Sequence, residues 1–248
     1  MKIGIFGTGN IGGTLARKFA SNGHDVRITK SDGAEKLKGF AAEIGATAVD
    51  AYGAVDGADL LILSIPFPAI ATLPKNLFDH VPATVPVVDT GNYYPGMRDP
   101  KIAEIDNGMI ESVWVSQQLG RPIIKAFNNI LAATLADLGR RSGSPDRIAA
   151  AVAGDDAAQK RIVMSFVDEV GLEPVDAGSL DESWRQQPST PAYCCDWNAN
   201  EMNEALAAAV KGEAAAKRDR MMEQYSALGP DITHDQMVAS NRKVNAGK

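Results

Sequence analysis

The chain has 248 residues, of which 45% are hydrophobic and 23% are charged, and its formal net charge is −6. That apolar content suffices for a sizeable core, in one domain with an appendage or in two small domains. The acidic balance argues against nucleic acid as the main partner, and no apolar run approaches the roughly 20 residues that a membrane span needs.

Localisation and metal content are predicted from the first residues and the cysteines. A predicted strand begins at Ile3, so we expect no signal peptide. The only two cysteines, Cys194 and Cys195, are adjacent and lack the spacing of metal ligands. We therefore expect a cytoplasmic protein with reduced, buried thiols and no metal site.

The first predicted element is a strand over residues 3–6, which leads directly into a glycine-rich turn. The turn matches the pattern G-x-G-x-x-G and consists of Gly7, Thr8, Gly9, Asn10, Ile11 and Gly12. An amphipathic run over 11–19 follows and predicts a helix. In this context the three glycines allow a tight turn, close approach of a pyrophosphate to the backbone, and close packing of helix on strand. The free amides and the dipole of the helix start would hold the anion, so we predict a dinucleotide site; the alternative is an ordinary turn.

Strands and helices alternate through the next hundred residues. Predicted strands cover 25–30, 47–49, 60–65, 86–89 and 123–127. Predicted helices cover 34–44, 52–55, 70–78 and 112–119, and 91–108 is a long loop of the kind that is usually functional. This order predicts an α/β fold: a Rossmann-type, doubly wound, mostly parallel sheet.

The pattern continues once more before strand signals end. Helices are predicted over 132–138 and 157–170, and strands over 148–153 and 173–176. After residue 180 we expect a long helix over 197–222 and a polar tail over 229–248. We expect the methionines of this long helix to pack in a core or a dimer interface: Met202, Met221 and Met222. We therefore predict that the chain consists of a dinucleotide-binding domain over 1–178 and a small, mainly helical extension over 179–248.

The choice of dinucleotide is read at the end of the second strand. Thr29, Lys30 and Ser31 could hold the 2′-phosphate of NADP through one charge and two hydroxyls. Asp32 lies at about the distance at which an acid binds the ribose of NAD, but beyond the predicted strand end. The position favours NADP; Lys30 as a solvated surface residue is the alternative.

Ligands of an open parallel sheet bind outside the carboxyl ends of its strands. Those ends carry residues suited to a nicotinamide and a planar acceptor: Ser64, Ile65, Pro66, Asn92, Asn128 and Ile130. Trp184 and Arg185 could close over the acceptor and grip an acidic group; alternatively they dock the C-terminal helix on the sheet.

We expect no catalytic acid or base. None of the three histidines lies near a predicted sheet end: His24 precedes the second strand, His80 ends a helix and His234 lies in the polar tail. Hydride transfer between two ring cofactors also needs little proton transfer. The pair Lys125 and Asn129 is similar to the lysine and asparagine of β-hydroxyacid dehydrogenases, but a structural lysine in a strand is the favoured interpretation.

Several motifs together resemble the NADPH-dependent reductases of the deazaflavin coenzyme F420. They are the glycine turn and the segments 64–67, 125–130, 152–156 and 175–178. The chain also resembles a related group, the cytosolic reductase domain of six-transmembrane ferric reductases. The resemblance spans residues 1 to about 200, and it implies a homodimer and direct hydride transfer from NADP(H) to a flat acceptor.

The resemblance also assigns residues. It places the pyrophosphate on residues 8–11, the 2′-phosphate on Lys30 and Ser31, and the nicotinamide beside Ile65 and Ala132. The family often has a histidine where Asn128 stands. We predict an oxidoreductase that moves hydride between NADP(H) and F420 or a flavin-like acceptor; the alternatives are an NAD(P)-dependent dehydrogenase or imine reductase for a small molecule, and a non-catalytic NAD(P)H-binding protein.

Overall fold

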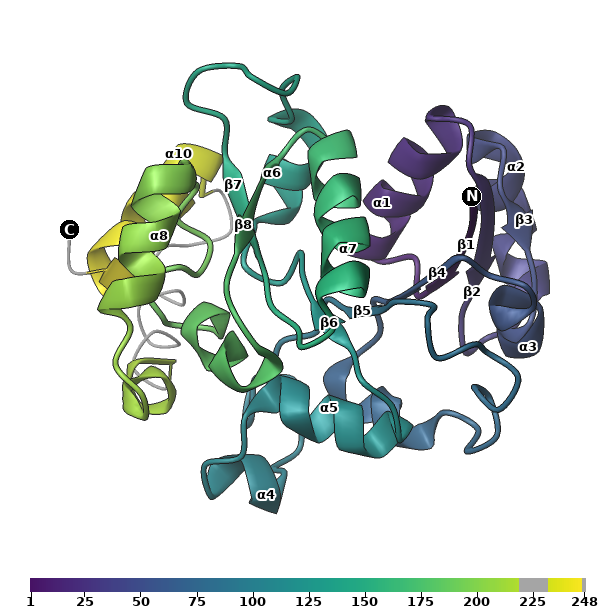
Figure 1. The fold of residues 1–248 in the computed structure, drawn as a ribbon, viewed down its shortest axis with the longest axis horizontal. Helices are drawn as coiled ribbons and strands as arrows, with labels where there is room; N and C mark the ends of the chain where they lie inside the picture. The colour runs from purple at the N-terminus through teal and green to yellow at the C-terminus, as the bar shows by residue number, and fades with distance from the viewer. Residues whose placement is uncertain (219–231, 247–248) are drawn as a thin grey trace.

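A computed structural model describes residues 1–218 and 232–246 (Figure 1). Its centre is a sheet of six parallel strands in the order β3-β2-β1-β4-β5-β6. The strands are β1 (Lys2–Phe6), β2 (Asp25–Thr29), β3 (Thr47–Ala48), β4 (Leu60–Leu63), β5 (Val87–Asp89) and β6 (Ile124–Lys125). The order runs outward in both directions from β1 and β4, which confirms the predicted doubly wound Rossmann-type sheet.

Helices cover both faces of this sheet. One face packs against α1 (Asn10–Ser21), α2 (Lys38–Ile44), α6 (Ala132–Asp137) and α7 (Ala157–Glu169). The other packs against α3 (Ala51–Val55), the 3-10 helix η2 (Phe67–Thr72) and α5 (Glu111–Leu119). β4 is buried on both sides, which explains why its sequence is a continuous apolar run instead of an alternating one.

The strand register aligns the carboxyl ends of the strands in one row. Phe6 pairs with Thr29 of β2 and Leu63 of β4, Leu63 pairs with Asp89, and Asp89 pairs with Lys125. Each strand therefore ends at the same edge, and the residues that follow it converge there.

The last two strands do not extend the parallel sheet as expected. β7 (Ala149–Val152) and β8 (Glu173–Asp176) form a separate parallel pair. β7 meets β6 through one antiparallel bridge between Lys125 and Ala153. Their outer face packs against residues 192–206, so this core cluster contains side chains from both sides of residue 178.

The C-terminal region differs from the predicted long helix over 197–222. Helix α8 (Ala199–Ala208) begins at a capping box of Asn198 and Glu201 and stops at Ala209, whose backbone is extended. Gly212, with φ of +88°, precedes a separate helical stretch over 213–218. Met202 lies in the core as predicted, whereas Met221, Met222 and residues 229–231 and 247–248 of the tail lie outside the described residues. The rest of the predicted polar tail contains α10 (His234–Asn241) and η4 (Arg242–Ala246).

Smaller differences concern prolines and the long loop. The helix predicted over 70–78 is wrong: η2 ends at Thr72, and Leu73 is extended because the following proline disfavours helical backbone there. The long loop contains one short helix, α4 (Ala103–Asp106). Within the described residues no helix has both the length and the apolar character to cross a membrane.

Candidate active site

The glycine turn after β1 has the geometry that its sequence predicts. Gly7 has φ of +90°, and a Cβ there would lie 2.2 Å from the carbonyl oxygen of Ser64. A Cβ on Gly12 would lie 2.2 Å from the carbonyl oxygen of Gly7. A Cβ on Gly9, by contrast, would meet no protein atom within 4 Å. Packing therefore requires glycine at Gly7 and Gly12, whereas Gly9 faces open space.

That open space lies at the start of α1. Gly9 is the N-cap residue, and no side chain in the described part of the chain caps the helix. Thr8 is half-buried and Asn10 is exposed beside it. Because a helix start leaves backbone amides without partners and carries the positive end of the dipole, this is a ready site for an anion.

The end of β2 carries both signs of charge. Thr29 is buried, and its carbonyl oxygen accepts a hydrogen bond of 2.8 Å from the amide of Gly7. Lys30 Nζ lies 3.2 Å from Asp32, which also approaches Lys36 Nζ at 3.6 Å. The hydrogen bond from Lys30 lowers the pKa of Asp32. The two residues that argue for different dinucleotides therefore form an ion pair with each other.

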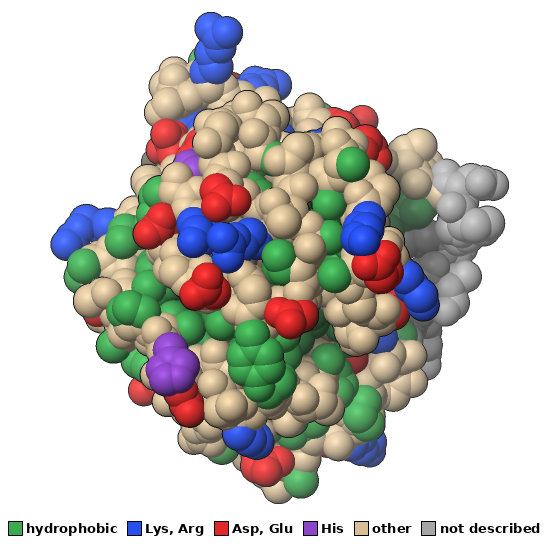
Figure 2. Space-filling model, turned by 90° about the vertical axis from the view of Figure 1, so that its right-hand side faces the viewer, with side chains coloured by type: hydrophobic (Ala, Val, Ile, Leu, Met, Phe, Trp, Pro, Cys, Tyr) green, Lys and Arg blue, Asp and Glu red, His purple; other side chains and the backbone are tan. Residues whose placement is uncertain are grey.

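This pairing is part of a wider pattern on that side of the molecule. The face that carries α2, β3 and α3 shows basic and acidic side chains next to one another (Figure 2). Arg17 pairs with Glu43 there, and Lys38 with Glu35. The face therefore offers local charges rather than one broad field of a single sign.

The residues after β4 border the glycine turn. Ser64 donates its amide to the carbonyl of Phe6 at 2.8 Å, which places it beside Gly7. Ser64 and Ile65 are half-buried and Pro66 is exposed. The structure thus brings the predicted nicotinamide residues of this strand to the same edge as the pyrophosphate turn.

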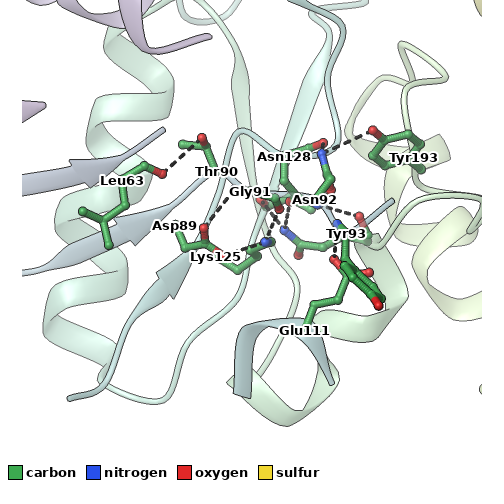
Figure 3. Close-up of polar contacts among 12 residues, drawn as sticks. Leu63, Asp89, Thr90, Gly91, Asn92, Tyr93, Glu111, Lys125, Asn128 and Tyr193 are labelled. Carbon is green, nitrogen blue, oxygen red and sulfur yellow. Dashed lines mark hydrogen bonds and ion pairs between the residues drawn. The ribbon is translucent and has the colours of Figure 1, made fainter. Parts of the chain in front are cut away.

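A buried ion pair joins the ends of β5 and β6. Lys125 Nζ lies 2.7 Å from Asp89, and both side chains are at most 1% exposed. The Lys125 ammonium also donates to the carbonyl of Gly91, while Asp89 accepts from the Gly91 amide at 2.9 Å (Figure 3). Asn129 does not contact this lysine; its amide donates to the carbonyl of Ala192. The burial of this ion pair fits a structural role for Lys125, the interpretation favoured from the sequence.

Asn92 and Asn128 form one hydrogen-bonded network. The Asn92 amide donates to the Asn128 carbonyl at 2.9 Å and to the Tyr193 hydroxyl at 3.2 Å (Figure 3). Asn128 donates to Asn92 Oδ1 and to the carbonyl of Gln186, and accepts from the Gln186 amide at 2.8 Å. Asn128, which was predicted to line the acceptor site, is 2% exposed. Its side chain is hydrogen-bonded to Gln186 of η3 (Leu180–Gln186) and to Asn92.

The other predicted acceptor residues are divided between surface and core. Ile130 is buried. Ala132, which was predicted to lie beside the nicotinamide and not the acceptor, is half-buried at the start of α6. Trp184 is 8% exposed. Arg185 stacks on Trp184 with 4.4 Å between guanidinium carbon and ring centroid, and pairs with Glu182. It also donates to a carbonyl at the end of α8, which matches the docking role given as its alternative.

Sequence analysis missed a buried acid in this region. Glu111, at the start of α5, is 4% exposed, and its carboxylate accepts from the Tyr93 amide at 3.2 Å (Figure 3). Burial raises its pKa to about 7, opposed by Lys125 and the Tyr93 hydrogen bond. The only signal in the sequence was an acid immediately before a predicted helix, which is common at exposed helix starts.

Comparisons with known proteins agree with the glycine turn and the sheet. Residues 2–93 match the family described as NADP oxidoreductase, coenzyme F420-dependent. The protein YjhV of Escherichia coli (strain K12) is 45% identical over 103 residues, which span 42% of this chain and 75% of YjhV. The chain belongs to this oxidoreductase family. Its matched segment runs from β1 through β5, and the family implies a nicotinamide cofactor.

Two solved structures have the same fold. The hypothetical protein SMa0349 of Sinorhizobium meliloti is 27% identical, with a TM-score of 0.63 over 75% of this chain and 90% of that one. A candidate F420-dependent NADP reductase from Arthrobacter sp. FB24 is 22% identical, with a TM-score of 0.60 over 74% of this chain and 87% of that one. At such identity the second likeness supports the fold alone. The fold and the family match together show that the chain has an NAD(P)-dependent oxidoreductase scaffold.

Proposed function

We propose that this protein transfers hydride between NADP(H) and a planar acceptor, the deazaflavin F420 or a flavin. The observation that carries the proposal is the uncapped start of α1 beside Gly9, at the point where the strand order reverses. A pyrophosphate held there would extend its nicotinamide toward the residues after β4 and β5. The two ring cofactors supply the chemistry, and the protein supplies their orientation and a site with little water.

A second candidate function is the reduction of a small carbonyl or imine compound. Such a reduction requires a proton as well as a hydride. Glu111 favours this candidate, because it is a buried carboxyl close to the end of β5 whose pKa is raised to about 7.

Spectrophotometric oxidation of NADPH separates these functions. The acceptors to compare are F420, FMN, ferric chelates and a panel of carbonyl and imine compounds. Oxidation of NADPH by F420 or FMN, but not by the carbonyl and imine compounds, supports the first function. Oxidation by the carbonyl or imine compounds, but not by F420 or FMN, supports the second. Tight NADPH binding without oxidation by any acceptor would instead indicate a binding protein. We also propose a homodimer, which sedimentation equilibrium tests.

The open space at Gly9 gives a direct test of the cofactor position. Gly9→Ala is expected to raise the Kd for NADPH at least ~10-fold, because the added methyl enters the space of the pyrophosphate. The free energy of unfolding should change by only about 1 kcal/mol, the usual cost of alanine at an N-cap. Gly39→Ala is the matched control, since Gly39 also faces open space but lies in α2. Unchanged NADPH affinity in Gly9→Ala would contradict the assignment.

The ion pair of Lys30 and Asp32 predicts opposite effects on cofactor preference. Lys30→Met is expected to raise the Kd for NADPH about 10-fold and leave that for NADH within about twofold, because only NADPH carries the 2′-phosphate. Asp32→Asn should tighten NADPH binding, because it removes the acid that neutralises Lys30. Isothermal titration with both nucleotides measures this; weaker NADH binding in Asp32→Asn with no gain for NADPH would show an NAD site instead.

A further inference from the structure

A cavity of about 450 Å³ opens beside the end of β5. Its walls come from the loop after β5, from α4 and the start of α5, from the end of η3, and from residues 211–218. In Figure 1, α4 and α5 lie below the sheet, and the yellow-green stretch of 211–218 lies to their left. The residues used below are Tyr93, Lys101, Asp106, Glu111, Trp184, Lys211 and Arg218.

Three cations line this cavity from two separate segments of the chain. Lys101 precedes α4, whereas Lys211 lies just before the helical stretch over 213–218 and Arg218 is its last residue. Neither Lys101 nor Lys211 forms an ion pair with any part of the chain that the structure describes. Lys211 Nζ lies 5.9 Å from the ring centroid of Trp184, and the Arg218 guanidinium lies 5.6 Å from that of Tyr93. The ring of Trp184 and the cations together suit a ring compound that carries an anionic group.

Two acids also line the cavity, and both are engaged. Asp106 accepts a hydrogen bond of 3.1 Å from the Tyr93 hydroxyl. Glu111 accepts from the Tyr93 amide at 3.2 Å. Among the described residues that line the cavity, the three cations therefore outnumber the two acids, and the positive excess is larger when Glu111 carries a proton.

The cavity shares one residue, Trp184, with the residues predicted to bind the acceptor. Tyr93 directly follows Asn92 in the chain, and Trp184 is one of the residues predicted to cover the acceptor. Arg185 does not line the cavity, because its guanidinium is directed at Glu182 and α8. The sequence predicted that Arg185 binds an acidic group. The cations that line the cavity are instead Lys101, Lys211 and Arg218.

We propose that this cavity binds the acidic group of the acceptor, a phosphate or a carboxylate, through Lys101, Lys211 and Arg218. The inference rests on the proposed function and specifies its substrate class: a planar acceptor with an anionic side chain. A ring without such a group would keep the stacking contacts and lose the charge-assisted hydrogen bonds.

Glu111 adds a dependence on pH. The charged and titratable groups around it are Tyr93, Lys125, Asp89 and Arg218, with Asp106, Lys101 and Lys211 elsewhere in the cavity. Its carboxyl has a pKa raised to about 7, so it gains negative charge above neutral pH. That charge would repel the anion of the acceptor. The second ionisation of a phosphate monoester, near pH 6, changes affinity in the opposite direction.

FMN and riboflavin test the proposal, because they share a ring system and differ by one phosphate. Binding is measured by flavin fluorescence in the presence of NADP⁺, and NADPH oxidation is followed with F420 and both flavins. We expect FMN to bind about 10-fold more tightly than riboflavin, and the double variant Lys101→Met/Lys211→Met to remove the difference. Riboflavin affinity should change less than about twofold. Lys75→Met is the control, because Lys75 is exposed and does not line the cavity.

The pH series supplies an independent readout. Between pH 6 and pH 8.5 the preference for FMN should rise in Glu111→Gln, where only the phosphate ionises, and the ratio of the preference at pH 8.5 to that at pH 6 should be smaller in the natural protein, where Glu111 also gains charge. Equal binding of the two flavins, or a preference for FMN that survives in the double variant, overturns the cavity proposal while the proposed function stands. No flavin binding together with no oxidation of NADPH by F420 or flavins would overturn the proposed function itself.

Discussion

Lys125→Met is expected to lower the free energy of unfolding by about 3–5 kcal/mol, because it leaves the Asp89 carboxylate buried without its counter-ion. The methionine fills a similar volume, so the loss reports charge and hydrogen bonding more than packing. The carbonyl of Gly91 also loses its donor, which should loosen the chain just before Asn92. Urea unfolding followed by circular dichroism measures the change.

A second substitution isolates the stranded charge. Adding Asp89→Asn to Lys125→Met removes the buried charge, while the new side chain can still accept from the Gly91 amide, so part of the lost stability should return. Lys38→Met is the matched surface control: Lys38 lies 2.6 Å from Glu35, but both side chains are well exposed, so we expect a change below about 1 kcal/mol. A similar cost for both lysines would contradict the role assigned to burial.

Most of the sheet could be predicted from the sequence, because its strands follow strong local rules. The continuous apolar run of β4 and the glycine turn after β1 each have one simple structural solution. The predicted strand over 123–127 is longer than β6, which ends at Lys125, and Phe127 with φ of +61° cannot continue it. Nothing in the identity of a phenylalanine indicates that conformation, which only tertiary packing can impose.

The C-terminal region could not be predicted because helix propensity is a weak signal. An alanine- and glutamate-rich run indicated one helix over 197–222, but Ala209 is extended and Gly212 has positive φ. The glycine was the one local warning. The separate β7–β8 pair was equally hidden, since strand periodicity does not say which partner a strand selects.

In the site, sequence reasoning located the residues but not their partners. It placed Asn128 and Arg185 near an acceptor, yet both use their polar atoms on other parts of the chain. It weighed Lys30 against Asp32 without foreseeing that they pair. Long-range contacts in this site join residues up to 101 positions apart, so spacing in the sequence carries no trace of them.

Glu111→Gln is expected to stabilise the protein at pH 8 by about 3 kcal/mol and to have little effect near pH 4.5. Burial raises the pKa of Glu111 from its ordinary value of 4.5 to about 7, so between these values the folded chain holds a proton that the unfolded chain has released. The stability that this carboxyl contributes is therefore complete below about pH 4.5 and is lost as pH rises to about 7, at about 1.4 kcal/mol per pH unit. Glutamine stays neutral throughout and keeps an oxygen that can accept from the Tyr93 amide.

The measurement is the difference in unfolding free energy between Glu111→Gln and the natural protein at pH 5, 6, 7 and 8. Taking the difference cancels every other group whose titration the two proteins share. The difference should grow from pH 5 to about pH 7 and then become constant, because above that pH both states of Glu111 are ionised. Glu104→Gln, an exposed carboxyl on α4, should stay within about 0.5 kcal/mol at each pH. A difference that shrinks with rising pH would mean that Lys125 and the Tyr93 amide outweigh burial, and that Glu111 is a stabilised carboxylate instead of a buried acid.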